Sequence, residues 1–119
     1  MTENKQPTVQ KQGEVAVLTP PAYFEKEAAE ETHRLVADLF RKGCRRFVID
    51  FSRCRVTNSP GVSLLMDLAF MVLDDYHGHL AFCGVDGSKE TMFTLLGIIP
   101  MVPVKPSLEE AIQEVSALK

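Results

Sequence analysis

The amino-acid sequence predicts a single α/β domain built around a mostly parallel central β-sheet. Two observations carry this prediction: short apolar runs alternate with amphipathic stretches, and no linker or internal repeat divides the 119 residues. Strands that alternate with helices favour a parallel sheet with right-handed crossovers, and a chain of this length supports one hydrophobic core. We expect about four helices and one antiparallel strand at the N-terminal side of the sheet.

The first third of the chain predicts a hairpin followed by a long helix. Residues 1–6 predict a disordered tail, so the domain itself spans residues 7–119. TVQKQGEVAVL alternates around Gly13, which is typical of a hairpin whose second arm is residues 14–18. Thr19 and Pro20 predict an N-cap and a first helical residue, with the helix extending to about residue 42. Its apolar stripe consists of Phe24, Ala28, Leu35, Val36, Leu39 and Phe40.

The middle of the chain predicts a central strand, a second helix and another buried strand. RRFVIDF is a compact apolar run with charged flanks, as expected for a strand that is buried on both faces. The helix begins near Pro60 and stops at Gly78, and LAFCGV after it predicts the next strand. The apolar positions of this helix are Leu64, Leu65, Leu68, Ala69 and Val72.

The C-terminal third predicts two helices that flank a short strand. SKETMFTLLG predicts a short helix, with Asp86 or Ser88 as its cap. MVPV predicts a short strand, and Pro103 places that strand at a sheet edge because proline has no N–H to donate. Ser107 and Glu110 form a capping box at the start of the last helix.

The bulk composition argues against several classes of function. A formal net charge of -3 and a pI near 5.6 give no general attraction to nucleic acid. Three cysteines without a C-x-x-C pair support neither a disulfide framework nor a zinc site. The longest apolar runs are well short of the roughly 20 residues that span a bilayer. We therefore expect a cytoplasmic protein with no cofactor, no direct nucleic-acid contact and no membrane span.

The segment FVIDFSRCRVTNSPGVSLLMDL resembles the hallmark strand-loop-helix of STAS domains, the anti-sigma-factor-antagonist family. The ending LLGIIPMVPVKPSLEEAIQEV and the early GEVAVL are also similar to that family, so the resemblance covers the chain from about Val9. Ser59 falls where the family's phosphorylated serine lies, and Gly61 falls on the motif glycine. Asn58 replaces the usual aspartate, and Pro60 replaces the second hydroxyl residue.

The resemblance implies a protein-binding switch rather than an enzyme. In this family the unphosphorylated form binds an anti-sigma factor, which is commonly also a serine kinase, and thereby frees a sigma factor. A dedicated serine phosphatase reverses the phosphorylation. By resemblance Ser59 is the phosphoacceptor and the surrounding loop is the docking site. The residues expected to contact the partner are Arg53, Arg55, Thr57, Asn58, Ser59, Pro60, Gly61, Val62 and Ser63.

Two interpretations of Ser59 follow from its neighbours. Serine directly before proline is a normal N-cap, and its replacement typically costs on the order of 1 kcal/mol. The same geometry tolerates a phosphate at the helix N-terminus, which adds roughly -1.5 to -2 charges to the surface. Asn58 forms hydrogen bonds but carries no charge and cannot act as a general base.

Other hypotheses remain beside the switch. One is a STAS scaffold, without phosphorylation, in a regulatory or membrane-transport assembly. A small serine hydrolase is another, although TNSPG lacks the first glycine of G-x-S-x-G and only His33, His77 and His79 are available as bases. A metal site at His77 and His79 is a further hypothesis, but the two histidines lack an obvious third ligand. The arginine-rich segment 41–55 has two explanations: solvated strand ends, or a basic edge that meets an acidic partner or an anionic lipid surface.

Overall fold

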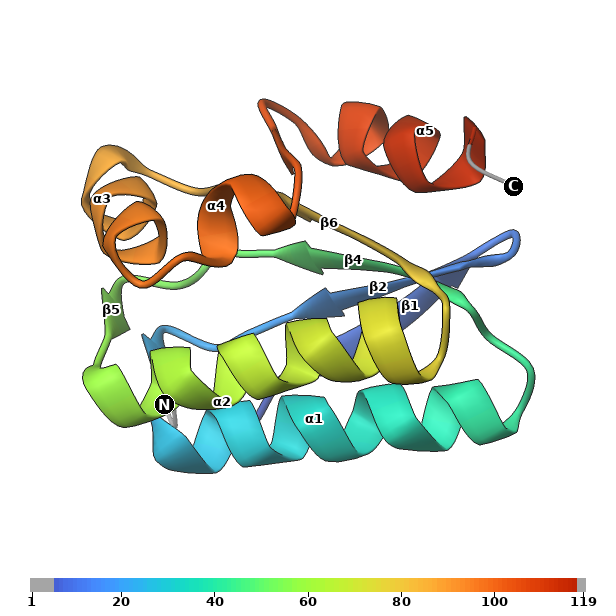
Figure 1. Cartoon of the computed structure of the whole chain (residues 1–119), viewed down its shortest axis with the longest axis horizontal. Coiled ribbons are helices and arrows are strands. Elements are labelled where there is room, and N and C mark those ends of the chain that lie inside the picture. The colour runs from blue at the N-terminus through green and yellow to red at the C-terminus, as the bar shows by residue number, and fades with distance from the viewer. Residues whose placement is uncertain (1–5, 118–119) are drawn as a thin grey trace, which may run out of the picture.

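A computed structural model describes residues 6–117 and confirms the predicted α/β architecture (Figure 1). Five strands form the central sheet in the order β1-β2-β4-β6-β7. β1 pairs with β2 in antiparallel orientation, and the other neighbouring pairs are parallel. The strands are β1 (Thr8–Gln12), β2 (Val15–Thr19), β4 (Arg46–Asp50), β6 (His79–Cys83) and β7 (Val104–Lys105). The predicted hairpin, the central strand and the edge position of the last strand are all confirmed.

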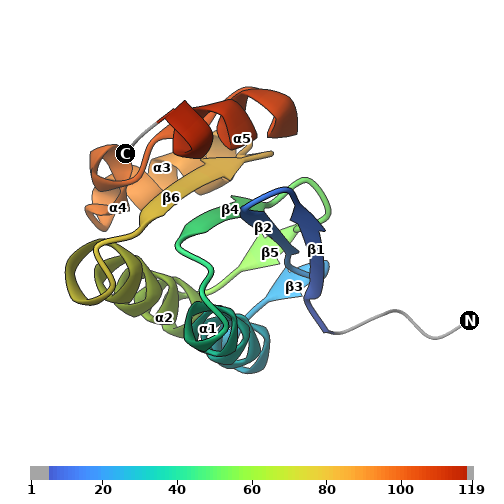
Figure 2. The same ribbon diagram turned by 90° about the vertical axis from the view of Figure 1, so that its right-hand side faces the viewer.

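Helices cover both faces of this sheet (Figure 2). α1 and α2 pack side by side on one face, and α5 packs on the other against β4 and β6. Within residues 6–117 the α-helices are α1 (Lys26–Arg41), α2 (Ser59–Phe70), α3 (Gly87–Leu95), α4 (Ile98–Met101) and α5 (Leu108–Ala117). The short α4 was not anticipated from the sequence. None of the helices in the described range is long and apolar enough to cross a membrane.

The alternation of side chains along the strands builds two hydrophobic layers. Successive strand residues point to opposite faces, so Phe47 and Ile49 face α1 and α2 whereas Val48 faces α5. All three are fully buried. The layer under α5 is the smaller one and is completed by Ala111 and Val115 of that helix. Burial on both faces explains why the strands read as continuous apolar runs.

The predicted start of the first helix at Thr19 and Pro20 is wrong. α1 begins at Lys26 with Glu25 as its N-cap. A residue that precedes proline is disfavoured in the α region, and here Pro21 follows Pro20 directly. The chain instead stays extended and forms β3 (Tyr23–Phe24), which pairs in parallel with β5 (Val56–Thr57). Phe24, predicted for the helical stripe, is fully buried from β3 instead.

The second helix ends differently from the prediction. α2 continues as a π-helical segment, Met71–Asp75, in which the Tyr76 N–H donates to the Met71 carbonyl five residues back. His77 rather than Gly78 has the left-handed conformation, with φ 52°. Gly78 is needed for a different reason, because a Cβ there would lie 2.7 Å from the Arg45 carbonyl oxygen.

The capping residues of the last two long helices are confirmed. Asp86 Oδ1 accepts from the Lys89 N–H at 2.9 Å at the start of α3. Ser107 Oγ accepts from the Glu110 N–H at 3.1 Å at the start of α5. The predicted tail, residues 1–6, lies outside the described residues except for Gln6, which is exposed.

Candidate functional site: the Ser59 loop

The Ser59 loop, defined as residues 51–61, leaves the sheet at the carboxyl end of β4. The Ser52 N–H donates to Asp50 Oδ1 at 2.9 Å and so fixes the first turn. Gly84 follows β6 with φ +69°, and a Cβ there would lie 2.4 Å from Ser52 N. The start of the loop is therefore packed backbone against backbone, without room for a side chain at position 84.

A cluster of buried phenylalanines supports the loop from the core. The Phe51 ring lies 5.6 Å from Phe24, 5.3 Å from Phe82 and 5.4 Å from Phe93, measured between ring centroids, in edge-to-face contacts. All four side chains are buried. Aromatic pairs of this kind add about 0.5–1.5 kcal/mol beyond area burial. These contacts hold the start of the loop against the hydrophobic core.

The two-stranded β3–β5 sheet fixes the middle of the loop. The Ala22 carbonyl accepts from the N–H groups of Arg55 at 2.7 Å and Val56 at 3.0 Å. Tyr23 pairs with Val56 across the strands. Both side chains are exposed, Tyr23 to 54% and Val56 to 42%. Two apolar side chains therefore stand next to each other on the surface beside the loop.

Asn58, not Ser59, is the N-cap of α2. Asn58 is extended, with φ -133° and ψ 171°, and its Oδ1 accepts from the Gly61 N–H at 2.9 Å. Ser59 is the first helical residue and Pro60 the second. Within residues 6–117 the Ser59 hydroxyl has no hydrogen-bond partner, and the residue is exposed. The prediction that Ser59 caps the helix is wrong, and its hydroxyl is left to the surface.

Gly61 holds the first turn of α2 against the chain that enters α1. A Cβ at Gly61 would lie 2.4 Å from the Phe24 carbonyl oxygen and 3.2 Å from Glu25 Cα. This close approach requires glycine irrespective of backbone conformation, because the obstacle is itself backbone. Val62 beside it is fully buried. Neither residue presents side-chain surface to a partner in this conformation.

Asn58 also links the loop to the N-terminus of α1. Its Nδ2 donates to Glu25 Oε2 at 3.4 Å while its Oδ1 caps α2. Aspartate at this position would set two carboxylates against each other, a pairing that disfavours the charged state of both. The amide is therefore suited to its surroundings in a way that the carboxylate is not.

Helix α3 closes the other side of the loop. Thr57 Oγ1 donates to Met92 Sδ at 3.3 Å. Lys89 is 4% exposed and its Nζ lies 2.7 Å from Asp86 Oδ2, an interaction that lowers the pKa of Asp86. Burial raises the pKa of the Cys54 thiol, against the opposing effect of the Lys89 charge. Cys54 therefore stays protonated at neutral pH and is no nucleophile.

The predicted contact residues fall into three groups by exposure. Arg53, Arg55, Ser59, Pro60 and Ser63 are exposed, Thr57 and Asn58 are half-buried, and Gly61 and Val62 are buried. The two arginines line a cavity together with Thr19 and Ala22, and no residue of the range 56–63 lines it. The two arginines thus share a cavity that the residues from Val56 to Ser63 do not line.

Sequence reasoning missed four exposed apolar side chains at this end of the molecule. Besides Tyr23 and Val56, Leu95 is 80% exposed and Leu96 is 47% exposed at the end of α3. Figure 1 shows α3 next to β5 at the end of the sheet where α2 begins. The consecutive leucines were visible in the sequence, but the pairing that brings Tyr23 to Val56 joins segments that are 33 residues apart.

Within residues 6–117, no histidine is hydrogen-bonded to Ser59 as a catalytic base would be. His77 and His79 lie at the amino end of β6, the opposite edge of the sheet. Burial, with the nearby charge and hydrogen bond of Asp50, raises the pKa of Cys83 to about 12. Residues 6–117 also contain no group of three side chains placed to hold a metal ion.

Comparison with known families settles which fold this is. A family model for the STAS domain matches residues 6–111. The chain belongs to the STAS domain family. A comparison with curated proteins gives no match.

Solved STAS structures have the same fold at low sequence identity. An anti-sigma factor antagonist from Mycobacterium paratuberculosis is similar with a TM-score of 0.78 and 16% identity, over 92% of each chain. The Bacillus cell fate determinant SpoIIAA in its phosphorylated form is similar with a TM-score of 0.71 and 19% identity, over 92% of this chain and 98% of that one. A sulfate transporter family protein from Wolinella succinogenes gives 0.76 and 16%, over 89% and 88%.

Proposed function

We propose that this STAS domain is a cytoplasmic anti-sigma factor antagonist that docks through the Ser59 loop and is switched by phosphorylation of Ser59. In this proposal the unphosphorylated form binds an anti-sigma factor that is also a serine kinase, and so frees the sigma factor. The observation that carries the proposal is the exposed, unbonded Ser59 hydroxyl at the first position of α2. No catalysis by the domain itself is proposed.

The docking surface combines polar loop residues with neighbouring apolar side chains. Thr57, Asn58, Ser59, Pro60 and Ser63 supply the polar part, and Tyr23 and Val56 supply exposed apolar area beside it. Aromatic side chains next to polar groups are typical of interface anchors. Gly61 and Val62 are buried and contribute by fixing the first turn of α2. Arg53 and Arg55 lie at the border of the docking surface.

A phosphate on Ser59 would remain at the surface instead of being enclosed by its own helix. Of the N–H groups at the first three helical positions, Pro60 has none and the Gly61 N–H is already bonded to Asn58 Oδ1. Only the N–H of Ser59 itself is left within these three. The added charge of roughly -1.5 to -2 would therefore face the partner, while the fold is unchanged.

Because position 58 is asparagine, the domain itself has no carboxylate there to act as a catalytic base for the phosphorylation of Ser59. An amide cannot remove the proton of the serine hydroxyl, so we expect the kinase to provide the base from its own side chains. The Asn58 side chain is also committed to Gly61 and Glu25. We infer that it positions the loop and takes no direct part in phosphate transfer.

The test is to incubate the protein with the serine kinase encoded nearest to its gene, with and without ATP, followed by mass spectrometry. We expect one phosphate on Ser59, absent in Ser59→Ala and retained in the control Ser116→Ala, which removes an exposed hydroxyl from α5 on the other face of the sheet. We also expect the complex that forms without ATP to dissociate as the phosphate appears. Modification of Ser116→Ala and Ser59→Ala to the same extent would refute the assignment.

A second candidate function is a STAS scaffold that binds its partner without being phosphorylated. The similarity to a sulfate transporter family protein and the replacement of the motif aspartate by Asn58 both favour it. Stable binding of the kinase in the presence of ATP, with no mass change in the domain, would establish the scaffold in place of the switch.

A further inference from the structure

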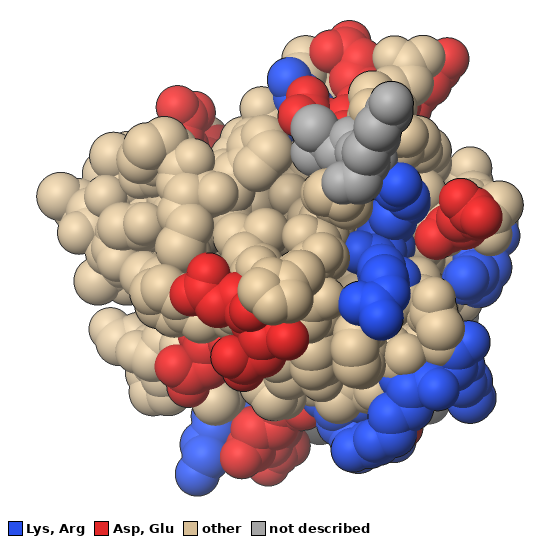
Figure 3. Space-filling view, turned by 45° about the vertical axis from the view of Figure 1, so that its right-hand side comes forward, with Lys and Arg blue, Asp and Glu red and all other residues tan. Residues whose placement is uncertain are grey.

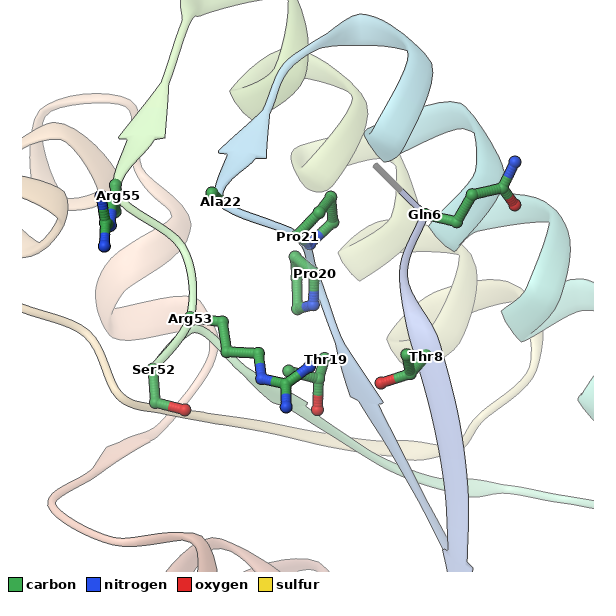
Figure 4. A pocket seen from close by; sticks show the side chains of 9 residues that line it. All are labelled: Gln6, Thr8, Thr19, Pro20, Pro21, Ala22, Ser52, Arg53 and Arg55. Carbon is green, nitrogen blue, oxygen red and sulfur yellow. The ribbon is translucent and has the colours of Figure 1, made fainter. Parts of the chain in front are cut away.

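A cavity of about 350 Å³ lies beyond the carboxyl ends of β2 and β4 (Figure 4). Thr19 and Ser52 line it from the strand ends, and Thr8 lines it from the start of β1. In open α/β sheets, ligands bind in the crevice outside the carboxyl ends of the strands. The volume is at the small end of the usual range of about 300–1,000 Å³ for ligand sites, which fits a molecule the size of a single ring.

The lining of this cavity is cationic. Arg53 and Arg55 are its only charged residues among those described, because no carboxylate lines it. Neither guanidinium forms an ion pair within residues 6–117, unlike Arg34 and Arg41, which are bonded to acidic neighbours on α1. Figure 4 shows the Arg53 side chain extending toward Thr19 across the opening. Arg53 therefore extends an unpaired guanidinium over a space with no internal counter-charge, and Arg55 lines the same space.

The remaining lining supplies hydroxyl groups and an apolar wall. Thr8, Thr19 and Ser52 carry hydroxyls that can donate to an anion, and the rings of Pro20 and Pro21 form the back of the cavity. Both prolines are buried, so this wall is fixed by the core behind it. A ligand with a charged group and a short apolar body would match both parts of the lining.

We propose that this cavity binds a small organic phosphate, a phosphomonoester with one ring-sized apolar group. Guanidinium groups bind phosphate oxygens in a bidentate manner, and such charge-assisted bonds are about twice as strong as neutral ones. A phosphomonoester carries close to two negative charges at neutral pH, which equals the two arginines, whereas a carboxylate carries one. The cavity shares Ser52, Arg53 and Arg55 with the Ser59 loop, but no residue of the range 56–63 lines it, so phosphate binding here is tested separately from phosphorylation of Ser59.

Isothermal titration calorimetry with phenyl phosphate, benzoate and inorganic phosphate tests the proposal on the whole protein. We expect phenyl phosphate to bind at least tenfold more tightly than either of the other two. Arg53→Gln and Arg55→Gln should each weaken phenyl phosphate binding at least tenfold. Arg41→Gln removes the same group from an exposed position at the end of α1 and should change the affinity less than twofold.

Amide chemical-shift mapping on the wild-type protein gives the location without any variant. The expected perturbations fall on residues 19–22 and 52–55. Perturbations confined to residues 42–46, at the opposite edge of the sheet, would overturn the assignment, as would the absence of binding. Equal affinities for phenyl phosphate and inorganic phosphate would overturn the organic class of the ligand. Unchanged affinity in both arginine variants would overturn the role of the guanidinium groups.

Discussion

The two ends of the parallel strands differ in how closely the backbone packs around them. The end at which the strands finish is called the carboxyl edge here, and the end at which they start is called the amino edge. At the carboxyl edge, where the Ser59 loop lies, Gly61 and Gly84 each face a backbone atom that would be 2.4 Å from an added Cβ. At the amino edge, Gly13 and Gly43 form turns with nothing within 4 Å of that position. Gly78 is an exception at the amino edge, because an added Cβ there would lie 2.7 Å from the Arg45 carbonyl oxygen. The carboxyl edge thus fixes its loop through two close backbone contacts, whereas Gly13 and Gly43 at the amino edge serve turn conformation.

The surfaces of the two edges differ in charge as well. Lys42, Arg45 and Arg46 line a cavity of about 390 Å³ at the amino edge, and Figure 3 shows basic side chains gathered over this part of the molecule. The surface around Ser59 instead exposes hydroxyl and apolar groups. Arg53 and Arg55 bring positive charge to the carboxyl edge as well, where they line the cavity beyond β2 and β4. The comparison teaches that the two edges differ in how closely their backbones pack, and that a phosphate at Ser59 would add charge to a surface of hydroxyl and apolar groups.

The largest expected effect comes from removing the aromatic support of the loop. Phe51→Ala deletes a buried ring that contacts three others, and we expect it to lower the free energy of unfolding by about 3–5 kcal/mol. At the amino edge, the half-buried Phe40 stacks on Tyr76 at 3.6 Å between centroids. Phe40→Ala should cost less, because part of its ring is already in water. Urea denaturation of both variants measures the difference, and equal losses would remove this part of the comparison.

The glycine contrast gives the next largest effect. Gly61→Ala forces backbone apart at the Phe24 carbonyl and should cost about 1–3 kcal/mol. Gly87→Ala is the matched control, because Gly87 also lies in the first turn of a helix but has open space at its Cβ position. It should be neutral or stabilising by up to about 1 kcal/mol. Thermal unfolding that ranks the two variants in the reverse order would contradict the close packing inferred here.

How much of this was predictable depended on whether the signal was local. Strands buried on both faces and the Ser107 cap of α5 follow from neighbouring residues, and the structure confirms them. The β3–β5 pairing does not, because two-residue strands carry no period and their partner is far away in sequence. The helix start was misplaced for a different, local reason: Thr19-Pro20 has the form of a cap, but the next residue, Pro21, opposes helical conformation at Pro20.

The site was predictable in position but not in detail. Asn58 and Ser59 are both good N-caps, so the sequence alone does not decide between them. The structure identifies Asn58 as the cap, because its Oδ1 accepts from the Gly61 N–H. Arg53 was expected at the docking surface from its nearness in sequence to Ser59, and that contact stays a prediction; the sequence did not show that Arg53 also lines the cavity beyond β2 and β4.

Substitutions at Asn58 are expected to change the free energy of unfolding by less than those at Phe51 and Gly61. Asn58→Ala removes the cap on Gly61 and should cost about 1 kcal/mol. Asn58→Asp keeps an acceptor for the same N–H but brings a carboxylate to Glu25, so we expect a stability between those of the wild type and Asn58→Ala at neutral pH. The second variant should recover in a Glu25→Gln background. A lack of recovery in denaturant titrations would show that the Asn58–Glu25 contact has no energetic role.

The Asp86–Lys89 pair predicts the smallest effect, a pH dependence. The pKa of Asp86 is lowered in the folded state by its hydrogen bond from Lys89, so the pair contributes fully above the unfolded value of about 3.9. That contribution is lost as the pH falls through the folded value. We expect the stability difference between the wild type and Asp86→Asn to shrink as the pH falls from about 5 to about 2, by less than about 1 kcal/mol because Asp86 is largely exposed. A difference that grows on acidification would reverse the sign and contradict the pairing.

The central claim is that a phosphate at Ser59 changes binding and leaves the fold intact. The most direct measurement compares the protein carrying phosphoserine at position 59 with the unmodified protein, by chemical denaturation and by titration against the anti-sigma factor. We predict unfolding free energies within about 0.5 kcal/mol of each other, together with an affinity at least a hundredfold weaker for the phosphorylated form. Equal affinities, or a loss of binding that accompanies a loss of folding, would contradict the account.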